Sequence, residues 1–203
     1  MMPGTIYLII ASVLWGVVHS ILASHATKDL IRRISGPLAF DRLYRFSYNF
    51  FSLASLFPIA AMLLTFPDKP LYSIASPWVY VTSVIQGLAV IMLIATLMQT
   101  DPLDFLGLRQ LTEIGESKPP VLVTDGWYAY VRHPLYLGTL ILFWLVPEMT
   151  VNRLAIIAAL SIYLVVGAYF EERKLLKDFG EAYAEYKAKT PMLIPKIGKS
   201  VNK

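Results

Sequence analysis

The sequence has no cysteine, which excludes disulfide bonds, thiolate metal sites and a cysteine nucleophile. Histidines number only three, and His19 and His25 are spaced so that they fall on different faces of a helix, which does not suit a metal site. The sequence also lacks a glycine-rich phosphate loop, a G-x-S-x-G motif and a soluble dinucleotide-binding motif. We therefore expect no bound metal.

Charged residues are scarce, at 16% of the chain, while hydrophobic residues make up 56% of its 203 residues. Soluble domains usually carry less apolar content, so the composition indicates a polytopic membrane protein. We predict an all-α fold in a single membrane-embedded domain, residues 1–203, because each long apolar run approaches the roughly 20 residues that a helix needs to cross a bilayer. Five transmembrane helices are expected, at about residues 5–24, 46–66, 78–98, 133–149 and 153–170.

The basic residues separate cleanly between the predicted loops. The first loop, the third loop (which includes Arg109, Lys118 and Arg132) and the C-terminal tail hold 16 of the 18 lysines and arginines, and the other two loops hold only Lys69 and Arg153. Because lysine and arginine accumulate on the cytoplasmic side, we expect the N-terminus outside and the C-terminus inside. The net charge of +4 then suits anionic lipid headgroups, and we expect no nucleic-acid partner.

The two ends of the chain have different patterns. The first apolar run is expected to be retained as a span, because its basic residues follow it, which is the reverse of a secretory signal. From Glu171 onward, apolar residues recur at helical spacing opposite charged ones, which predicts an amphipathic helix along the membrane surface that stops at Thr190-Pro191. The residues Lys196–Lys203 are expected to form a solvated basic end.

A dense polar and aromatic stretch, residues 125–138, precedes the fourth predicted span. Its Pro134 is a natural first residue for that helix, so His133 is expected at a helix N-terminus, where anions are favoured. Tyr128, Tyr130 and Tyr136 could supply hydroxyls and flat faces to a bound group, including a cationic one. The alternative is an interfacial belt of aromatic and basic residues that binds nothing.

Glu171 and Glu172 are adjacent carboxylates at the cytoplasmic end of the fifth predicted span. Such a pair needs water or cationic partners, and a helix end with charges reaching to water is the simpler explanation. However, the fourth and fifth spans are expected to form a hairpin, so the glutamates should lie beside the His133 region. The two features together predict one site.

The C-terminal half resembles the isoprenylcysteine carboxyl methyltransferase family and its phospholipid methyltransferase relatives. The resemblance rests on the order and spacing of four segments: V-L-V-T-D-G-W-Y at 121–128, R-H-P-L-Y-L-G at 132–138, the Glu171-Glu172 pair, and F-G-E-A-Y-A-E-Y at 179–186 followed by T-P-M-L-I-P at 190–195. The first half, with His19-Ser20 and the stretch from Arg42 to Asn49, is similar to NnrU-type and methanethiol methyltransferase-like members.

The resemblance implies an integral membrane methyltransferase that uses S-adenosylmethionine, with a cytoplasmic cofactor region at residues 118–138 and 171–195. It also implies a bacterial or archaeal inner-membrane location, with the active site facing the cytoplasm. The residues that it places in the cofactor site are Val121, Leu122, Val123, Tyr128, His133, Pro134, Tyr136 and Glu171. No catalytic residue is assigned.

The chain departs from the resemblance at Gly167, where eukaryotic members have an arginine implicated in substrate binding. Arg173 and Arg132 are therefore the candidates on the substrate side. A small thiol, an isoprenoid carboxylate and a lipid amine stay open as the lipid-soluble or small acceptor. A non-catalytic NnrU-like assembly protein that keeps the fold is the alternative function. A transporter is disfavoured, because the sequence shows no inverted repeat.

Overall fold

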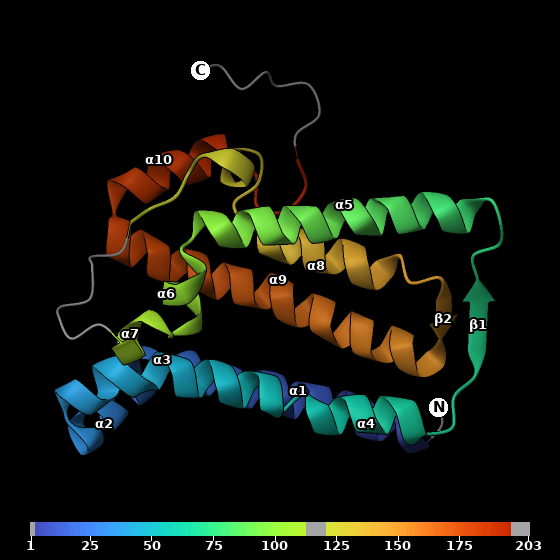
Figure 1. Ribbon diagram of the computed structural model, residues 1–203, viewed down its shortest axis with the longest axis horizontal. Helices are drawn as coiled ribbons and strands as arrows, with labels where there is room; N and C mark the ends of the chain where they lie inside the picture. Colours follow the sequence, from blue (N-terminus) through green and yellow to red (C-terminus); the bar gives the residue numbers. More distant parts are fainter. Residues whose placement is uncertain (1–2, 113–120, 196–203) are drawn as a thin grey trace. The chain divides into compact units, whose positions relative to one another are not determined.

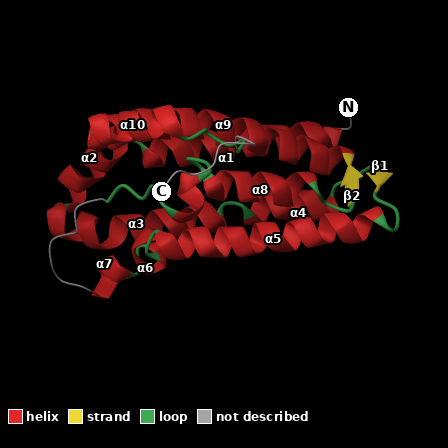
Figure 2. Ribbon diagram, turned by 90° about the horizontal axis from the view of Figure 1, so that it is seen from above, coloured by secondary structure: helices red, strands yellow, loops and turns green. Residues whose placement is uncertain are grey.

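The computed structural model describes residues 3–112 and 121–195 of the chain. Two predicted features lie outside the described residues: the start of the expected cofactor region, residues 118–120 with Lys118, and the basic end Lys196–Lys203. The described chain is almost entirely helical, with two short strands, β1 (Pro70–Ser73) and β2 (Glu148–Thr150), that pair with each other (Figure 2). The all-α prediction is confirmed.

The helices fall into two compact units that interleave along the sequence. The first unit comprises Met1–Tyr72, Asp101–Pro119 and Met149–Leu160, and the second comprises Ser73–Thr100, Pro120–Glu148 and Ser161–Lys203. The first unit contains α1 (Pro3–Ala23), α2 (His25–Ser35), α3 (Pro37–Ala54), α4 (Phe57–Thr65), α6 (Pro102–Leu106) and α7 (Arg109–Thr112). The second contains α5 (Trp78–Gln99), the 3-10 helix η1 (Gly126–Ala129), α8 (Pro134–Trp144) and α10 (Glu181–Lys189), and α9 (Val151–Phe179) begins in the first unit and ends in the second.

Buried polar side chains hold the first unit together. Asn152, at the start of α9, is fully buried; Thr5 Oγ1 donates to its Oδ1 at 2.6 Å, and its Nδ2 donates to the Pro67 carbonyl at 3.1 Å. His19 of α1 lies 2.9 Å from Ser52 Oγ and 2.6 Å from Tyr48 Oη through its two ring nitrogens. These contacts join α1 to α3, and polar side chains commonly join membrane helices in this way.

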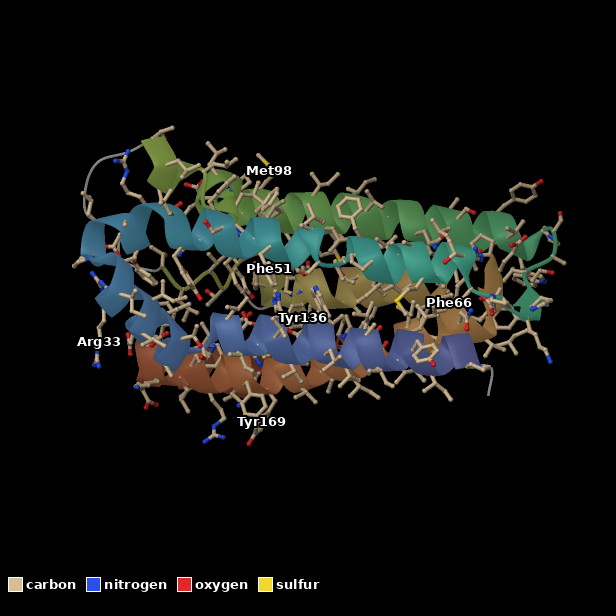
Figure 3. The ribbon with its side chains drawn as sticks, turned by 90° about the horizontal axis from the view of Figure 1, so that it is seen from below. Arg33, Phe51, Phe66, Met98, Tyr136 and Tyr169 are labelled. Carbon is tan, nitrogen blue, oxygen red and sulfur yellow. The ribbon has the colours of Figure 1, made fainter. Side chains whose placement is uncertain are left out.

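Four helical segments of the described chain are long and apolar enough to cross a membrane: Pro3–Ala23, Pro37–Thr65, Trp78–Gln99 and Val151–Phe179. Their outward side chains are apolar; Val84, Leu88, Ile91 and Ile94 of α5 are each at least 58% exposed, and Met98 projects from the same helix (Figure 3). Large apolar side chains in such numbers suit a lipid solvent. The protein is an all-α polytopic membrane protein.

The predicted spans differ from these helices in their extent. The first and third match α1 and α5 within two residues, but the second begins at Pro37 and is interrupted between α3 and α4. The fourth was predicted too long: α8 has 11 residues, which extend about 16 Å at 1.5 Å per residue and do not cross a bilayer of about 30 Å. The fifth, α9, extends to Phe179. The count of five spans stays a prediction.

In the second unit, α8 packs along α5, as Figure 1 shows. The close approach depends on Gly138, because a Cβ built there would lie 2.8 Å from Leu93 Cδ2. Gln86 Nε2 of α5 also donates to the Leu142 carbonyl of α8 at 2.9 Å, so a polar side chain joins the two helices. This contact fixes the helix that begins at Pro134, directly after His133.

The C-terminal segment differs from the predicted continuous amphipathic helix. The helix α9 continues past Glu171 to Phe179, and Gly180, with φ of 55°, separates it from α10. Glycine tolerates this left-handed conformation, which other residues rarely adopt. The predicted stop is confirmed, since α10 ends at Lys189. Its position on a membrane surface stays a prediction.

Candidate functional site

The residues around His133 are held against the C-terminal segment by main-chain hydrogen bonds. Arg132 N donates to the Pro191 carbonyl at 2.9 Å, and His133 N donates to the Met192 carbonyl at 3.1 Å. Tyr186 Oη of α10 donates to the Tyr128 carbonyl at 2.7 Å. The structure therefore brings together the described parts of the two segments that the sequence paired, before α8 and after α9.

The centre of the site is His133, which is 5% exposed. Its ring stacks on Tyr136, one turn along α8, with centroids 5.2 Å apart and planes 16° apart. Its Nε2 lies 3.3 Å from Glu172 Oε1, and its Nδ1 lies 3.7 Å from Glu171 Oε2. Tyr136 Oη donates to the same Glu171 oxygen at 2.8 Å. The imidazole thus lies between two carboxylates from α9.

Glu172 is the buried member of the glutamate pair and is surrounded by cations. Arg132 Nε donates to its Oε1 at 2.7 Å, and Lys187 Nζ of α10 lies 2.9 Å from its Oε2. Arg132 also donates to the carbonyls of Lys187 and Thr190. A buried carboxylate is tolerated only when it is paired and hydrogen-bonded in this way. The cluster of Glu172, Arg132 and Lys187 joins three segments of the second unit.

Sequence reasoning gave Glu172 no role of its own. Adjacent residues on a helix point about 100° apart, because the helix has 3.6 residues per turn. The sequence shows two neighbouring carboxylates but not which of them turns inward. The one available signal is the basic residue Lys187 on the following helix, whose partner the sequence does not identify.

Glu171 keeps an accessible carboxylate, with its side chain 46% exposed. Beside it, burial and the negative charge of Glu171 raise the pKa of Tyr128 to about 12. The phenol is therefore neutral and able to donate near neutral pH. Tyr136 and Tyr128 thus lie near this carboxylate, and the predicted role of Tyr128, Tyr130 and Tyr136 in contacting a bound group stays a prediction.

The other predicted cofactor residues have varied environments. Pro134 is buried as the first residue of α8, whereas Val121 is 80% exposed and Leu122 and Val123 are partly buried. The role of these four in a cofactor site stays a prediction.

The two substrate-side candidates differ from each other. The Arg132 side chain donates hydrogen bonds to Glu172 and to two main-chain carbonyls. Arg173 is exposed, and its guanidinium lies 5.9 Å from the ring centroid of Tyr169, which projects outward from α9 in Figure 3. At Gly167, no described atom comes within 4 Å of a Cβ built on the backbone. A substrate role for either arginine stays a prediction.

Metal chemistry has no candidate centre in the part of the chain that the structure describes, where no group of three or more His, Asp or Glu side chains could hold a metal ion. The expectation that no metal is bound stays a prediction.

The fold and the site together define a polytopic α-helical membrane protein with a His-Tyr-Glu cluster where α8 begins. The chain belongs to the NnrU protein family, whose profile matches residues 7–196.

Several proteins named as methyltransferases are similar to this chain in sequence. Methanethiol S-methyltransferase 1 of Bradyrhizobium diazoefficiens is 34% identical over 191 residues, covering 90% of this chain and 64% of the relative. Methanethiol S-methyltransferase of Crocosphaera subtropica is 42% identical over 113 residues, covering 54% of this chain and 44% of the relative. Protein-S-isoprenylcysteine O-methyltransferase of Schizosaccharomyces pombe is 35% identical over 127 residues, covering 51% and 52%.

These matches confirm the family resemblance that the sequence predicted. The chain spans only 64%, 44% and 52% of the length of these three relatives. No solved structure matches the chain.

Proposed function

We propose that the protein is an integral membrane methyltransferase that uses S-adenosylmethionine and acts on a small or lipid-soluble acceptor. The observation that carries this proposal is the arrangement of His133, Tyr136 and Glu171: a stacked pair of flat rings beside an accessible carboxylate. The relatives named as methyltransferases support the same activity.

The residues present fit the chemistry of this cofactor. Glu171 would accept from the ammonium or the ribose hydroxyls, and the stacked rings of His133 and Tyr136 offer a face to the adenine or the sulfonium. Glu172 cannot compete for this role, because Arg132 and Lys187 already occupy its oxygens. When bound, S-adenosylmethionine supplies an electrophilic methyl group.

Methyl transfer is an in-line displacement, for which positioning of the two partners supplies much of the rate. The site does this with parts that are held rigidly: Pro134 begins α8, Tyr136 holds Glu171, and the hydrogen bonds to Pro191 and Met192 fix the chain before His133. A thiolate or carboxylate acceptor needs no further base, whereas an amine must first lose a proton.

We propose that the active site faces the cytoplasm of a bacterial or archaeal cell, with the N-terminus outside. The separation of basic residues between loops supports this orientation, because lysine and arginine are retained on the cytoplasmic side. A cysteine inserted at Asp68, in the loop after α4, should react with a membrane-impermeant reagent in intact cells. A cysteine inserted at Glu185 of α10 should react only after permeabilisation.

Cofactor binding tests the enzyme proposal against a non-catalytic assembly protein. The purified protein should be stabilised by S-adenosylmethionine, by about 2.7 kcal/mol at one hundred times Kd. Glu171→Gln should remove most of this stabilisation, and the matched control Glu181→Gln, an exposed carboxylate of α10, should keep it. Absence of any stabilisation at millimolar cofactor would favour the assembly protein.

A further inference from the structure

The second unit contains a pocket of about 740 Å³ that is separate from the His133 cluster. One face of α5 forms one wall, since Met92, Ala95 and Gln99 recur at helical spacing. The segment from Gly126 to Val131 forms another wall, and Leu137 of α8 and Pro195 complete the lining. Seven of these lining residues fall within the expected cofactor region, residues 118–138 and 171–195, but none of them is among the individual residues that the resemblance places in the cofactor site.

The pocket suits an uncharged molecule. In the described part of the chain its lining contains no acidic or basic side chain, and most of the surface it offers is aliphatic or aromatic. A ligand with a carboxylate, an ammonium and a sulfonium would lose its hydration there without gaining charged partners, which is costly. The charged cofactor therefore belongs with Glu171, and a neutral molecule belongs in the pocket.

The size of the pocket argues against a very small occupant. Pockets of about 300–1,000 Å³ hold drug-sized ligands, whereas a thiol with two heavy atoms needs on the order of two water volumes, or about 60 Å³. The 740 Å³ here is several times more than such a thiol fills. The occupant should therefore carry a sizeable apolar group.

The pocket and the His133 cluster share a wall. Val131, which is 2% exposed, lines the pocket two residues before His133, and Leu137 lines it directly after Tyr136. Pro195 follows the segment whose Met192 carbonyl accepts from His133 N. A molecule in the pocket therefore lies against the same short segment that presents His133 and Tyr136.

We infer that this pocket holds the apolar body of the methyl acceptor, which is therefore an uncharged, lipid-soluble molecule and not only a one-carbon thiol. This inference rests on the proposed function, and it names the acceptor class for that site. Gln99, Trp127 and Tyr130 carry the polar side-chain groups of the described lining and would meet any hydrogen-bonding group on the acceptor.

The reaction with a thiol acceptor balances without a further reactant. The thiol gives its proton to solvent, its sulfur forms a bond to the methyl carbon, and the bond from that carbon to the sulfonium breaks. The products are a methyl thioether and S-adenosylhomocysteine.

Turnover of methane-, butane-, hexane- and octanethiol by the purified protein with methyl-labelled cofactor tests the inference. We expect kcat/KM to rise with chain length, by up to about fourfold for each added methylene that is buried. Ala95→Phe should place a ring in the pocket and lower the ratio of kcat/KM between octanethiol and methanethiol. Ile94→Phe is the matched control, because Ile94 is the adjacent residue of α5 and is 58% exposed, and it should keep the ratio.

A binding measurement separates this inference from the proposed function, since it needs neither cofactor nor turnover. Bromooctane should quench the fluorescence of Trp127 saturably, measured as the difference between the wild type and Trp127→Phe. Ala95→Phe should remove the saturable quenching, and Ile94→Phe should retain it. Saturable quenching in a protein that S-adenosylmethionine does not stabilise would show that the pocket binds an apolar molecule, and it would overturn the methyltransferase.

Two results would overturn the inference itself. One is a kcat/KM that is independent of chain length or falls with it, while cofactor binding is normal. The other is quenching of Trp127 that does not saturate, or that Ala95→Phe and Ile94→Phe change equally.

Discussion

Glu171 and Glu172 are neighbours in the chain, yet their side chains are 46% and 5% exposed. Glu172 is enclosed by Arg132 and Lys187, and Glu171 is held by Tyr136 with one side open. Both carboxylates approach His133 from α9. Because only Glu172 is buried and paired with cations, it serves the structure, and Glu171 is available to a ligand. A substitution of Glu172 should therefore mainly lower stability, whereas a substitution of Glu171 should mainly weaken cofactor binding.

Glu172→Gln should lower the free energy of unfolding by about 3 kcal/mol, since it leaves Arg132 buried without its carboxylate. Chemical denaturation in detergent would measure this change. Glu171→Gln is the matched control, with a change below about 1 kcal/mol because its side chain is half exposed. Equal losses for the two variants would contradict the division of roles.

Gly126→Ala should destabilise the second unit. Gly126 has φ of +56°, which costs other residues about 1–2 kcal/mol, and a Cβ there would lie 1.6 Å from Gln99 Nε2. Adding Gln99→Ala should recover the part of the loss that comes from the clash and leave the part that comes from the backbone. The thermal midpoints of both variants would show the difference.

Gly87→Ala provides the control for Gly126→Ala. Gly87 lies within α5, and nothing described lies within 4 Å of a Cβ built there. Alanine should therefore be neutral or should stabilise the helix by up to about 1 kcal/mol. A loss at Gly87 as large as at Gly126 would show that the Gln99 contact is unimportant.

Asn152→Ala should cost about 2–3 kcal/mol in the free energy of unfolding, because it leaves the buried Thr5 hydroxyl and the Pro67 carbonyl without their partner. The double variant Thr5→Val with Asn152→Leu should lose less than Asn152→Ala, since it removes both polar groups together. Denaturant unfolding of the three proteins would measure this coupling. A double variant that loses as much as Asn152→Ala, or more, would argue against a shared network.

Alkaline pH should unfold the protein through its buried phenols. Burial, followed by the charge of Glu171, raises the pKa of Tyr128 to about 12; burial, followed by the charge of Glu172, raises the pKa of Tyr183 to about 12. Because the folded state holds these protons more tightly than the unfolded state, stability present below pH 10.0 is lost as the pH rises toward 12.

The titration of tyrosinate absorbance would check this. Tyr128→Phe and Tyr183→Phe should each remove one late-ionising group and flatten the loss of stability. Ionisation of all tyrosines in one step near their ordinary pKa, while the protein is still folded, would contradict the burial argument.

Much of the fold could be predicted because the relevant signals are local. Apolar runs of known length predicted α1 and α5 closely, and the Thr190-Pro191 pair predicted the end of α10. The extent of α8 and the break at Gly180 were mispredicted. An apolar run shows that a segment is buried or lies in lipid, but it does not show where the helical hydrogen bonds stop.

The site was predicted in part for a similar reason. His133, Tyr136 and Glu171 were expected together from their places at the ends of two neighbouring helices. In the structure, Tyr136 Oη and His133 Nδ1 lie 2.8 Å and 3.7 Å from the same Glu171 oxygen. The pairing of Arg132 with Glu172, 40 residues apart in the chain, and the pocket beside Ala95 were not expected. Both depend on which face each helix turns toward its neighbours.

By itself, the sequence determined the class of this protein. Its apolar runs follow from composition and order alone and specify a helical membrane protein, while the order and spacing of its motifs indicate its family. The tertiary structure decided which of two adjacent glutamates is buried and what lies beside His133. Neighbouring residues of a helix point about 100° apart, so one can be buried while the next is exposed. Only the packing of the end of α9 against the other segments of the second unit decides which of the two glutamates is buried.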